Sequence, residues 1–251
     1  MLNQTDLKDY MESFFGYGRW SAPVWFVGIE EAGGKNEPEI ERRLAVWTSR
    51  GHKELEDAPT FYPASGNPNW HKEYPTMQAT WKQLIRVLLL AQGKYDDDKS
   101  ILDFQRTKLG SAAGHTCLAE LLPLPSPDTA TWNYDRWTET PMLSSRRFYF
   151  LNIQGPRAEA LKARCVTFHP SVVIFYGLQL ADGTNLLPLW SRIAGGWFDQ
   201  AIERKKILLC RRNDRTIFFV TRHPVSESDA YFREIGCFLR DNHSTQFLRC
   251  T

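Results

Sequence analysis

The feature that most constrains the fold of this chain is a short apolar run that ends in a glycine and two acids. The run is Val24–Gly28, and after Ile29 it is followed by Glu30, Glu31, Ala32 and two more glycines. An unbroken apolar run of this length predicts a strand that is buried on both faces, as in the centre of a parallel sheet. Because open α/β sheets bind ligands beyond the carboxyl ends of their strands, we expect a functional site at Glu30 and Glu31.

The remaining apolar patterns predict an alternation of strands and helices. Further strands are predicted at residues 116–122, 171–177 and 216–221. The clearest helices are predicted at residues 5–15, 76–92, 144–168 and 227–240. We expect a break near Gly155 in the third helix, and a loop without regular elements at residues 51–70. The alternation predicts a single α/β domain over residues 1–251, a three-layer α/β/α sandwich around a central four-stranded parallel sheet.

Composition excludes several classes of protein. The longest apolar run, residues 84–91, contains Arg86 and is too short to cross a membrane. The first residues lack the basic and apolar regions of a signal peptide, so we expect a cytoplasmic protein without a membrane partner. The five cysteines are scattered, and none pairs with another at metal-ligand spacing. We therefore expect buried cysteines in a reducing compartment, and no metal site.

Basic residues are concentrated near the end of the chain, although the formal net charge is only +2. Residues 192–222 hold eight basic side chains against three acidic ones. The basic residues are Arg192, Arg204, Lys205, Lys206, Arg211, Arg212, Arg215 and Arg222. Such a cluster is typical of a surface that contacts phosphates, and equally of a solvated helix end and hairpin, so charge alone leaves both interpretations open.

Reactive side chains accompany three of the predicted strands. Glu30 and Glu31 follow the first strand, Glu120 lies within the second, and His223 follows the last. The carboxyl ends of parallel strands share one edge, so we expect these groups to face one cleft. A carboxylate and a histidine there suit hydrolysis, since one can orient water and the other can stabilise a leaving group. His169 precedes its strand, so we interpret it as structural.

Four motifs resemble the uracil-DNA glycosylase superfamily. Residues 27–34 resemble its first motif, a strand and a turn that hold the water-activating residue. Residues 118–127 resemble its second strand and proline-rich exit, and residues 158–177 resemble its next helix and strand. Residues 221–226, Thr-Arg-His-Pro-Val-Ser, resemble its last motif. The resemblance implies a four-stranded parallel sheet flanked by helices, and no cofactor.

The resemblance also implies roles for individual residues. Glu30 takes the place of the acid that orients water, and His223 that of the histidine that hydrogen-bonds the departing base. Phe61 or Tyr62 should stack on the flipped base. The expected DNA contacts are Arg222, Val225 and Ser226 in the wedging loop, with Lys205, Arg211 and Arg212 in the basic cluster.

The chain departs from the family where the base is read. Glu120 stands where the family has an asparagine that reads uracil, and a carboxylate accepts from an exocyclic amine and repels the O4 atom of uracil. Ala32, Gly33 and Gly34 are small where the uracil enzymes exclude bulk at C5, so Glu31 and Gly33 are expected to border the base. These differences predict a C5-modified cytosine, as in the antiviral glycosylases that excise glucosylated hydroxymethylcytosine from phage DNA.

The sequence therefore predicts a monomeric DNA glycosylase that flips out a modified base and hydrolyses its N-glycosidic bond. DNA is the one partner that we expect. Two alternatives stay open: a uracil or mismatch repair glycosylase, and an inactive member that only binds nucleic acid.

Overall fold

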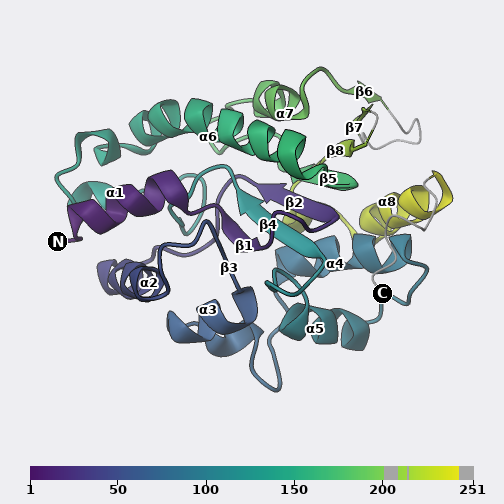
Figure 1. Ribbon diagram of the computed structural model, residues 1–251, viewed down its shortest axis with the longest axis horizontal. Helices are drawn as coiled ribbons and strands as arrows, with labels where there is room; N and C mark the ends of the chain where they lie inside the picture. Colours follow the sequence, from purple (N-terminus) through teal and green to yellow (C-terminus); the bar gives the residue numbers. More distant parts are fainter. Residues whose placement is uncertain (201–208, 214, 243–251) are drawn as a thin grey trace.

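The computed structural model describes residues 1–200, 209–213 and 215–242, and one mixed β-sheet forms its centre (Figure 1). The strands lie in the order β3-β1-β4-β2-β5-β8-β7-β6. Their bounds are β1 Gly16–Gly18, β2 Val24–Gly28, β3 Leu55–Glu56, β4 Thr116–Glu120, β5 Val172–Tyr176, β6 Asp199–Gln200, β7 Leu209–Arg212 and β8 Ile217–Thr221.

The four predicted strands form the parallel centre of this sheet. β4, β2, β5 and β8 are neighbours and all run in the same direction. Every residue of β2 and β5 is buried, as their unbroken apolar sequences predict. The prediction of a four-stranded sheet was too narrow, because β1 pairs with β4 and β7 pairs with β8, both antiparallel. β1 is Gly-Tyr-Gly, which is too short to give a periodic signal.

Helices pack on both faces of the sheet, with α6 and α7 on one face and α4, α5 and α8 on the other (Figure 1). Gly236 lets α8 lie close to α4, since a Cβ atom there would stand 2.7 Å from that of Leu90. The helix bounds are α1 Gln4–Ser13, α2 Glu37–Ser49, α3 Ala58–Ala64, α4 Ala79–Ala91, α5 Asp98–Thr107, α6 Arg146–Phe168, α7 Leu187–Ala194 and α8 Asp229–Asn242. Short 3-10 helices are η1 Pro68–Trp70, η2 Tyr134–Arg136, η3 Pro141–Leu143 and η4 Pro224–Ser226.

Two predictions about proline-containing segments were wrong. Residues 51–70 contain β3, α3 and η1, because Pro59 and Pro68 fall in the first turns of their helices, where proline is tolerated. α6 runs unbroken through Pro156. Pro156 is exposed, and so is residue 152, whose carbonyl loses its helical partner and can be hydrated instead.

A buried arginine fixes the end of β4. The guanidinium of Arg157 donates to the main-chain carbonyls of Phe14, Glu120 and Leu121, at 2.7, 2.9 and 3.1 Å. Burial lowers the pKa of Arg157 to about 9, and its charge lies over the ring of Phe15. These three hydrogen bonds hold the end of β4 in place inside the molecule.

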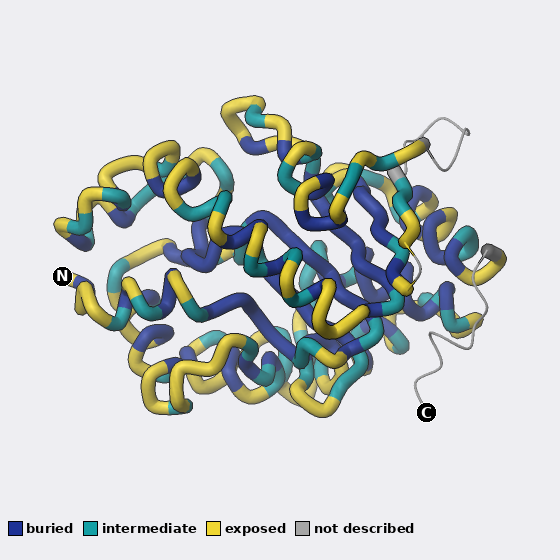
Figure 2. Tube along the Cα trace, turned by 45° about the horizontal axis from the view of Figure 1, so that its top comes forward, coloured by how far each residue is buried: buried dark blue, intermediate teal, exposed yellow. Residues whose placement is uncertain are grey.

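Figure 2 shows the buried strands enclosed by helices with exposed outer sides.

Candidate active site

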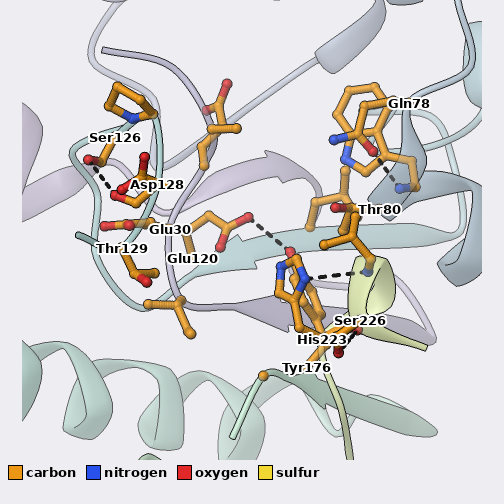
Figure 3. Close-up of a pocket in the computed structure, with 18 of the residues that line it drawn as sticks. Glu30, Gln78, Thr80, Glu120, Ser126, Asp128, Thr129, Tyr176, His223 and Ser226 are labelled. Carbon is orange, nitrogen blue, oxygen red and sulfur yellow. Dashed lines mark hydrogen bonds between the residues drawn. The ribbon is translucent and has the colours of Figure 1, made fainter. Parts of the chain in front are cut away.

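A cavity of about 870 Å³ lies at the carboxyl ends of β2, β4, β5 and β8 (Figure 3). The segments that follow these strands supply most of its wall, at residues 29–32, 126–129, 177–181, 222–223 and 225–226. The start of α4, with Gln78 and Thr80, lines a further part beside Trp70. Glu30, Glu120 and His223 all line this cavity, so the structure brings the main candidate residues together.

Hydrogen bonds between the loops fix the shape of the cavity. Ala32 and Ser126 form a parallel β-bridge, in which the Ser126 N–H donates to the Glu31 carbonyl at 3.0 Å. The Ala181 N–H donates to the Thr129 hydroxyl at 3.1 Å, which joins the loop after β5 to the loop after β4. The turns after three neighbouring strands are therefore tied to one another, and the acids between them have defined positions.

Glu30 is buried and is hydrogen-bonded through only one of its oxygens. Its side chain is 5% exposed, and its Oε1 atom accepts a hydrogen bond from Arg146 at the start of α6. Its Oε2 atom is buried without a partner among the described residues. Burial raises the pKa of Glu30 to about 7, although the Arg146 charge opposes the rise. Glu30 can therefore exchange a proton near neutral pH, through an oxygen that is unoccupied.

Glu120 forms a pair with the hydroxyl of Tyr176. That hydroxyl donates to Glu120 Oε1 at 3.1 Å, and Glu120 Oε2 has no partner within the described part of the chain. Burial and then the nearby Glu31 charge hold the pKa of Glu120 well above its usual range, so the protonated form is favoured. Gly28, opposite Glu120 in the sheet, makes this arrangement possible. A Cβ atom on Gly28 would stand 2.3 Å from both Glu120 Oε2 and the Tyr176 oxygen.

His223 is held as a neutral hydrogen-bond donor. Its Nδ1 atom accepts from the Val225 N–H at 3.4 Å, which assigns the ring proton to Nε2. Burial lowers the pKa of His223, so the ring is neutral at neutral pH. Figure 3 shows the imidazole beside the Glu120–Tyr176 pair, on the side of the cavity away from Asp128 and Thr129.

Glu31 differs from Glu30 in that both of its oxygens are engaged. Arg43 donates to the two oxygens at 2.5 and 2.8 Å, and the Tyr17 hydroxyl donates to one of them at 2.7 Å. The side chains of Glu31 and Arg43 are 11% and 6% exposed. Glu31 lines the cavity, as predicted for a residue that borders the base, but its hydrogen-bonding capacity is used by this ion pair.

Of the two aromatic residues predicted to stack on a base, only Tyr62 lines the cavity. Tyr62 stacks on Tyr17, with ring centroids 4.8 Å apart, and belongs to a cluster with Trp70 and Trp81 that also reaches the cavity. Phe61 is fully buried against Tyr17 and under Arg43, so it is a core residue.

The glycines after Glu31 do not provide the room that was predicted. A Cβ atom on Gly33 would stand 2.9 Å from a Glu39 oxygen, and one on Gly34 would stand 2.3 Å from the Pro125 carbonyl oxygen. Both positions are packed against protein, and neither lines the cavity. Ala32 does line it, so the small residue that leaves space there is the alanine.

The predicted DNA contacts divide into two groups. Arg222, Val225 and Ser226 line the cavity, and Val225 is 61% exposed. Arg211 instead donates to the carbonyls of Ala194 and Gly195, at 3.2 and 3.1 Å, at the end of α7.

Strand pairing places Arg211 and Arg212 away from the cavity. Arg212 pairs with Ile217, at the amino end of β8, whereas His223 follows the carboxyl end of that strand. Arg211 and Arg212 therefore lie towards the edge opposite the cavity, apart from Arg222, Val225 and Ser226. Lys205 lies outside the described residues.

Arg146 and Tyr176, which contact the two acids directly, were not predicted from the sequence. Tyr176 ends an apolar strand, where an aromatic residue carries no functional signal. Arg146 gave a weak signal, because a basic residue in the first turn of a helix opposes the helix dipole.

Comparison with known proteins adds no assignment: no family model, no curated protein and no solved structure matches the chain. Among the described residues, no group of three His, Cys, Asp or Glu side chains is placed to hold a metal ion. In the same part of the chain, no helix combines the length and apolar character needed to cross a membrane.

Proposed function

We propose that this protein is a DNA glycosylase that flips a modified cytosine into the cavity and hydrolyses its N-glycosidic bond, leaving an abasic site. One observation carries the proposal: a carboxyl group with an unoccupied oxygen, a second carboxyl group and a neutral histidine donor all line one cavity. Excision requires a base to leave the stack and enter such a pocket. The motifs that resemble the uracil-DNA glycosylase superfamily contribute Glu30, Glu120 and His223 to it.

The three groups suit the charges that develop during hydrolysis. Glu30 Oε2 takes a proton from water, and the water oxygen forms a bond to C1′ of the sugar as the bond from C1′ to the base nitrogen breaks. The electrons of the broken bond move onto the base, and His223 Nε2–H donates to the oxygen that becomes negative. The Glu30 carboxylate also stabilises the positive charge on the sugar.

Glu120 is the proposed reader of the base. A protonated carboxyl group can donate to N3 of cytosine through one oxygen and accept from the N4 amine through the other. Two features support a preference for a cytosine with a bulky C5 group: Ala32, which lines the cavity, is small, and the cavity is large. A cavity of about 870 Å³ is in the range that takes a ligand much larger than a bare base. A glucosylated hydroxymethylcytosine of phage DNA fits these requirements, and its excision would act as defence against phage.

The protonation of Glu120 favours a second candidate, a uracil glycosylase. A neutral carboxyl group can also donate to O4 of uracil and accept from its N3–H, which an ionised carboxylate cannot do. The identity of the base thus depends on the state of Glu120, and on how far the cavity excludes a smaller base.

Val225 is the proposed wedge in the duplex. It is exposed on η4, next to His223, and an apolar side chain that enters the base stack there would favour the flipped state. Arg222 is exposed beside it, and we assign it a contact with the DNA backbone.

The proposal is tested with duplexes that each contain one glucosylated hydroxymethylcytosine, hydroxymethylcytosine, cytosine or uracil. Alkali cleaves the strand at abasic sites, so the fraction cleaved measures base release. We expect release of the glucosylated base, and we expect Glu30→Gln to abolish release while DNA binding persists. Release of uracil alone would overturn the substrate assignment in favour of the second candidate. Binding without release of any base would leave the binding-only alternative.

A further inference from the structure

Arg146 is the residue that holds Glu30. It is the first residue of α6, and its side chain is 13% exposed. Its guanidinium pairs with Glu30 Oε1, donates to the Thr131 carbonyl at 3.4 Å and lies 5.9 Å from the ring centre of Trp132. Its Nε atom is buried and has no partner among the described residues. The side chain of Arg146 is therefore largely buried, and Glu30 Oε1 is the charged group that it contacts.

The position of Arg146 is unfavourable for the helix that carries it. A helix N-terminus carries partial positive charge and favours acids, yet α6 begins with Arg146 and Arg147 and has no acid in its first turn. Arg147 is exposed, so its charge is screened by water, whereas Arg146 is turned inward. A side chain that departs from the local rule and is also partly unsatisfied is typical of a functional site.

We infer that Arg146 is a positioning residue that holds the Glu30 carboxylate by Oε1 and so leaves Oε2 as the atom that accepts a proton from water. The catalytic part of this inference rests on the proposed glycosylase function. One terminal nitrogen of Arg146 occupies Glu30 Oε1 and the other donates to the Thr131 carbonyl, so Arg146 is anchored and Oε2 is the Glu30 oxygen left to act on water.

The same contact controls the charge of Glu30. The groups that act on Glu30 or respond to it are Arg146 and Tyr149 on α6, Asp128 in the loop after β4, Glu120 on β4 and Tyr134 on η2. Arg146 is the cation among them, and the Asp128 charge opposes the ionisation of Glu30. Removal of Arg146 would leave Glu30 buried without a cation, so Glu30 should keep its proton to higher pH.

A carboxyl titration tests this inference independently of any enzymatic activity. The protein is labelled with ¹³C at glutamate side-chain carboxyl groups, and the Glu30 signal is assigned by its loss in Glu30→Gln. In Arg146→Met we expect the midpoint of the Glu30 titration to rise by about one to three pH units. Arg147→Met is the matched control, since it removes the same charge from the next residue, and it should leave the midpoint in place. Arg146→Lys keeps the charge and should move the midpoint less than Arg146→Met.

The catalytic consequence is read from the pH profile of base release under single turnover. In Arg146→Met the rise in the rate of base release should shift to higher pH, by the same amount as the Glu30 midpoint. Release should then be at least about tenfold slower near neutral pH and should be partly regained at alkaline pH. Arg146→Lys should recover most of the rate. A loss that is equal at every pH would indicate structural damage and would overturn the positioning role.

The two proposals fail in different ways. If the Glu30 midpoint is the same in Arg146→Met as in the wild type, the inference about Arg146 is wrong whatever the enzyme releases. If the midpoint rises in Arg146→Met but the wild type releases no base, Arg146 does control the protonation of Glu30, and the proposed glycosylase function is wrong.

Discussion

Replacement of Glu30 by glutamine should make the protein more stable at alkaline pH. Glutamine has the shape of the protonated glutamic acid, and it can still accept a hydrogen bond from Arg146 through its carbonyl oxygen. It cannot ionise, so it avoids the cost of a buried charge. Residues that serve a reaction commonly lower stability in this way.

The magnitude follows from the raised pKa of Glu30, which is about 7 in the folded protein against 4.5 for an unperturbed glutamate. Between these two values the folded chain keeps a proton that the unfolded chain has released, so the wild type loses stability as the pH rises. At about 1.4 kcal/mol for each pH unit, the loss is roughly 3 kcal/mol by pH 8, while little of it is present at pH 5. The stability of the glutamine variant, relative to the wild type, should therefore increase by about 2–3 kcal/mol between pH 5 and pH 8.

Urea unfolding of both proteins at pH 5 and pH 8 measures this difference. Glu12→Gln is the control, because Glu12 lies on the surface of α1, 63% exposed, and its replacement removes the same formal charge. A relative stability of the Glu30 variant that stays constant, or that falls towards pH 8, would refute the reasoning. It would mean that Glu30 is ionised at low pH in a stabilising pair with Arg146.

Three further predictions concern the neighbouring residues. Arg43→Met should lower the free energy of unfolding by about 3–5 kcal/mol in urea, because it leaves Glu31 buried without its cation, and replacing both residues by methionine should cost less. In a single-turnover assay, Glu120→Gln should release a cytosine-type base at a rate within about tenfold of the wild-type rate, because an amide offers the same donor and acceptor as the protonated acid. A loss of about a thousandfold would show that the ionised carboxylate is needed. Arg222→Ala should weaken DNA binding and reduce the slope of affinity against salt by about one, whereas Arg211→Ala should change neither, in fluorescence-anisotropy titrations.

Glu30 and Glu31 show how far neighbours in sequence can diverge in the folded chain. The two acids are adjacent at the end of one strand, and only the resemblance to the glycosylases predicted different roles for them. Arg43, on the helix that follows, occupies both oxygens of Glu31, whereas Arg146 occupies one oxygen of Glu30 from 116 residues away. Of these two acids, Glu30 is therefore the one with an oxygen that has no partner among the described residues.

The aromatic and basic residues show the limits of composition. Phe61 and Tyr62 are adjacent, yet the short helix α3 buries the first in the core and turns the second towards the cavity. The basic residues around Arg211 in the sequence suggested that it contacts phosphate. In the structure β7 pairs antiparallel with β8, and Arg211 hydrogen-bonds to the end of α7. Neither outcome could be predicted, because each depends on how segments pack and not on their own pattern.

The sequence by itself determined the parallel centre of the sheet and the edge at which its reactive residues gather. It could do so because unbroken apolar runs specify buried parallel strands, and because the residue after such a strand lies at a known edge. The tertiary structure alone decided that Glu30 keeps one oxygen without a partner among the described residues, that both oxygens of Glu31 are engaged, and which of the buried acids favours its protonated form. Those properties depend on burial and on charges brought together by long-range contacts, as Glu30 and Arg146 are, and no local pattern encodes them.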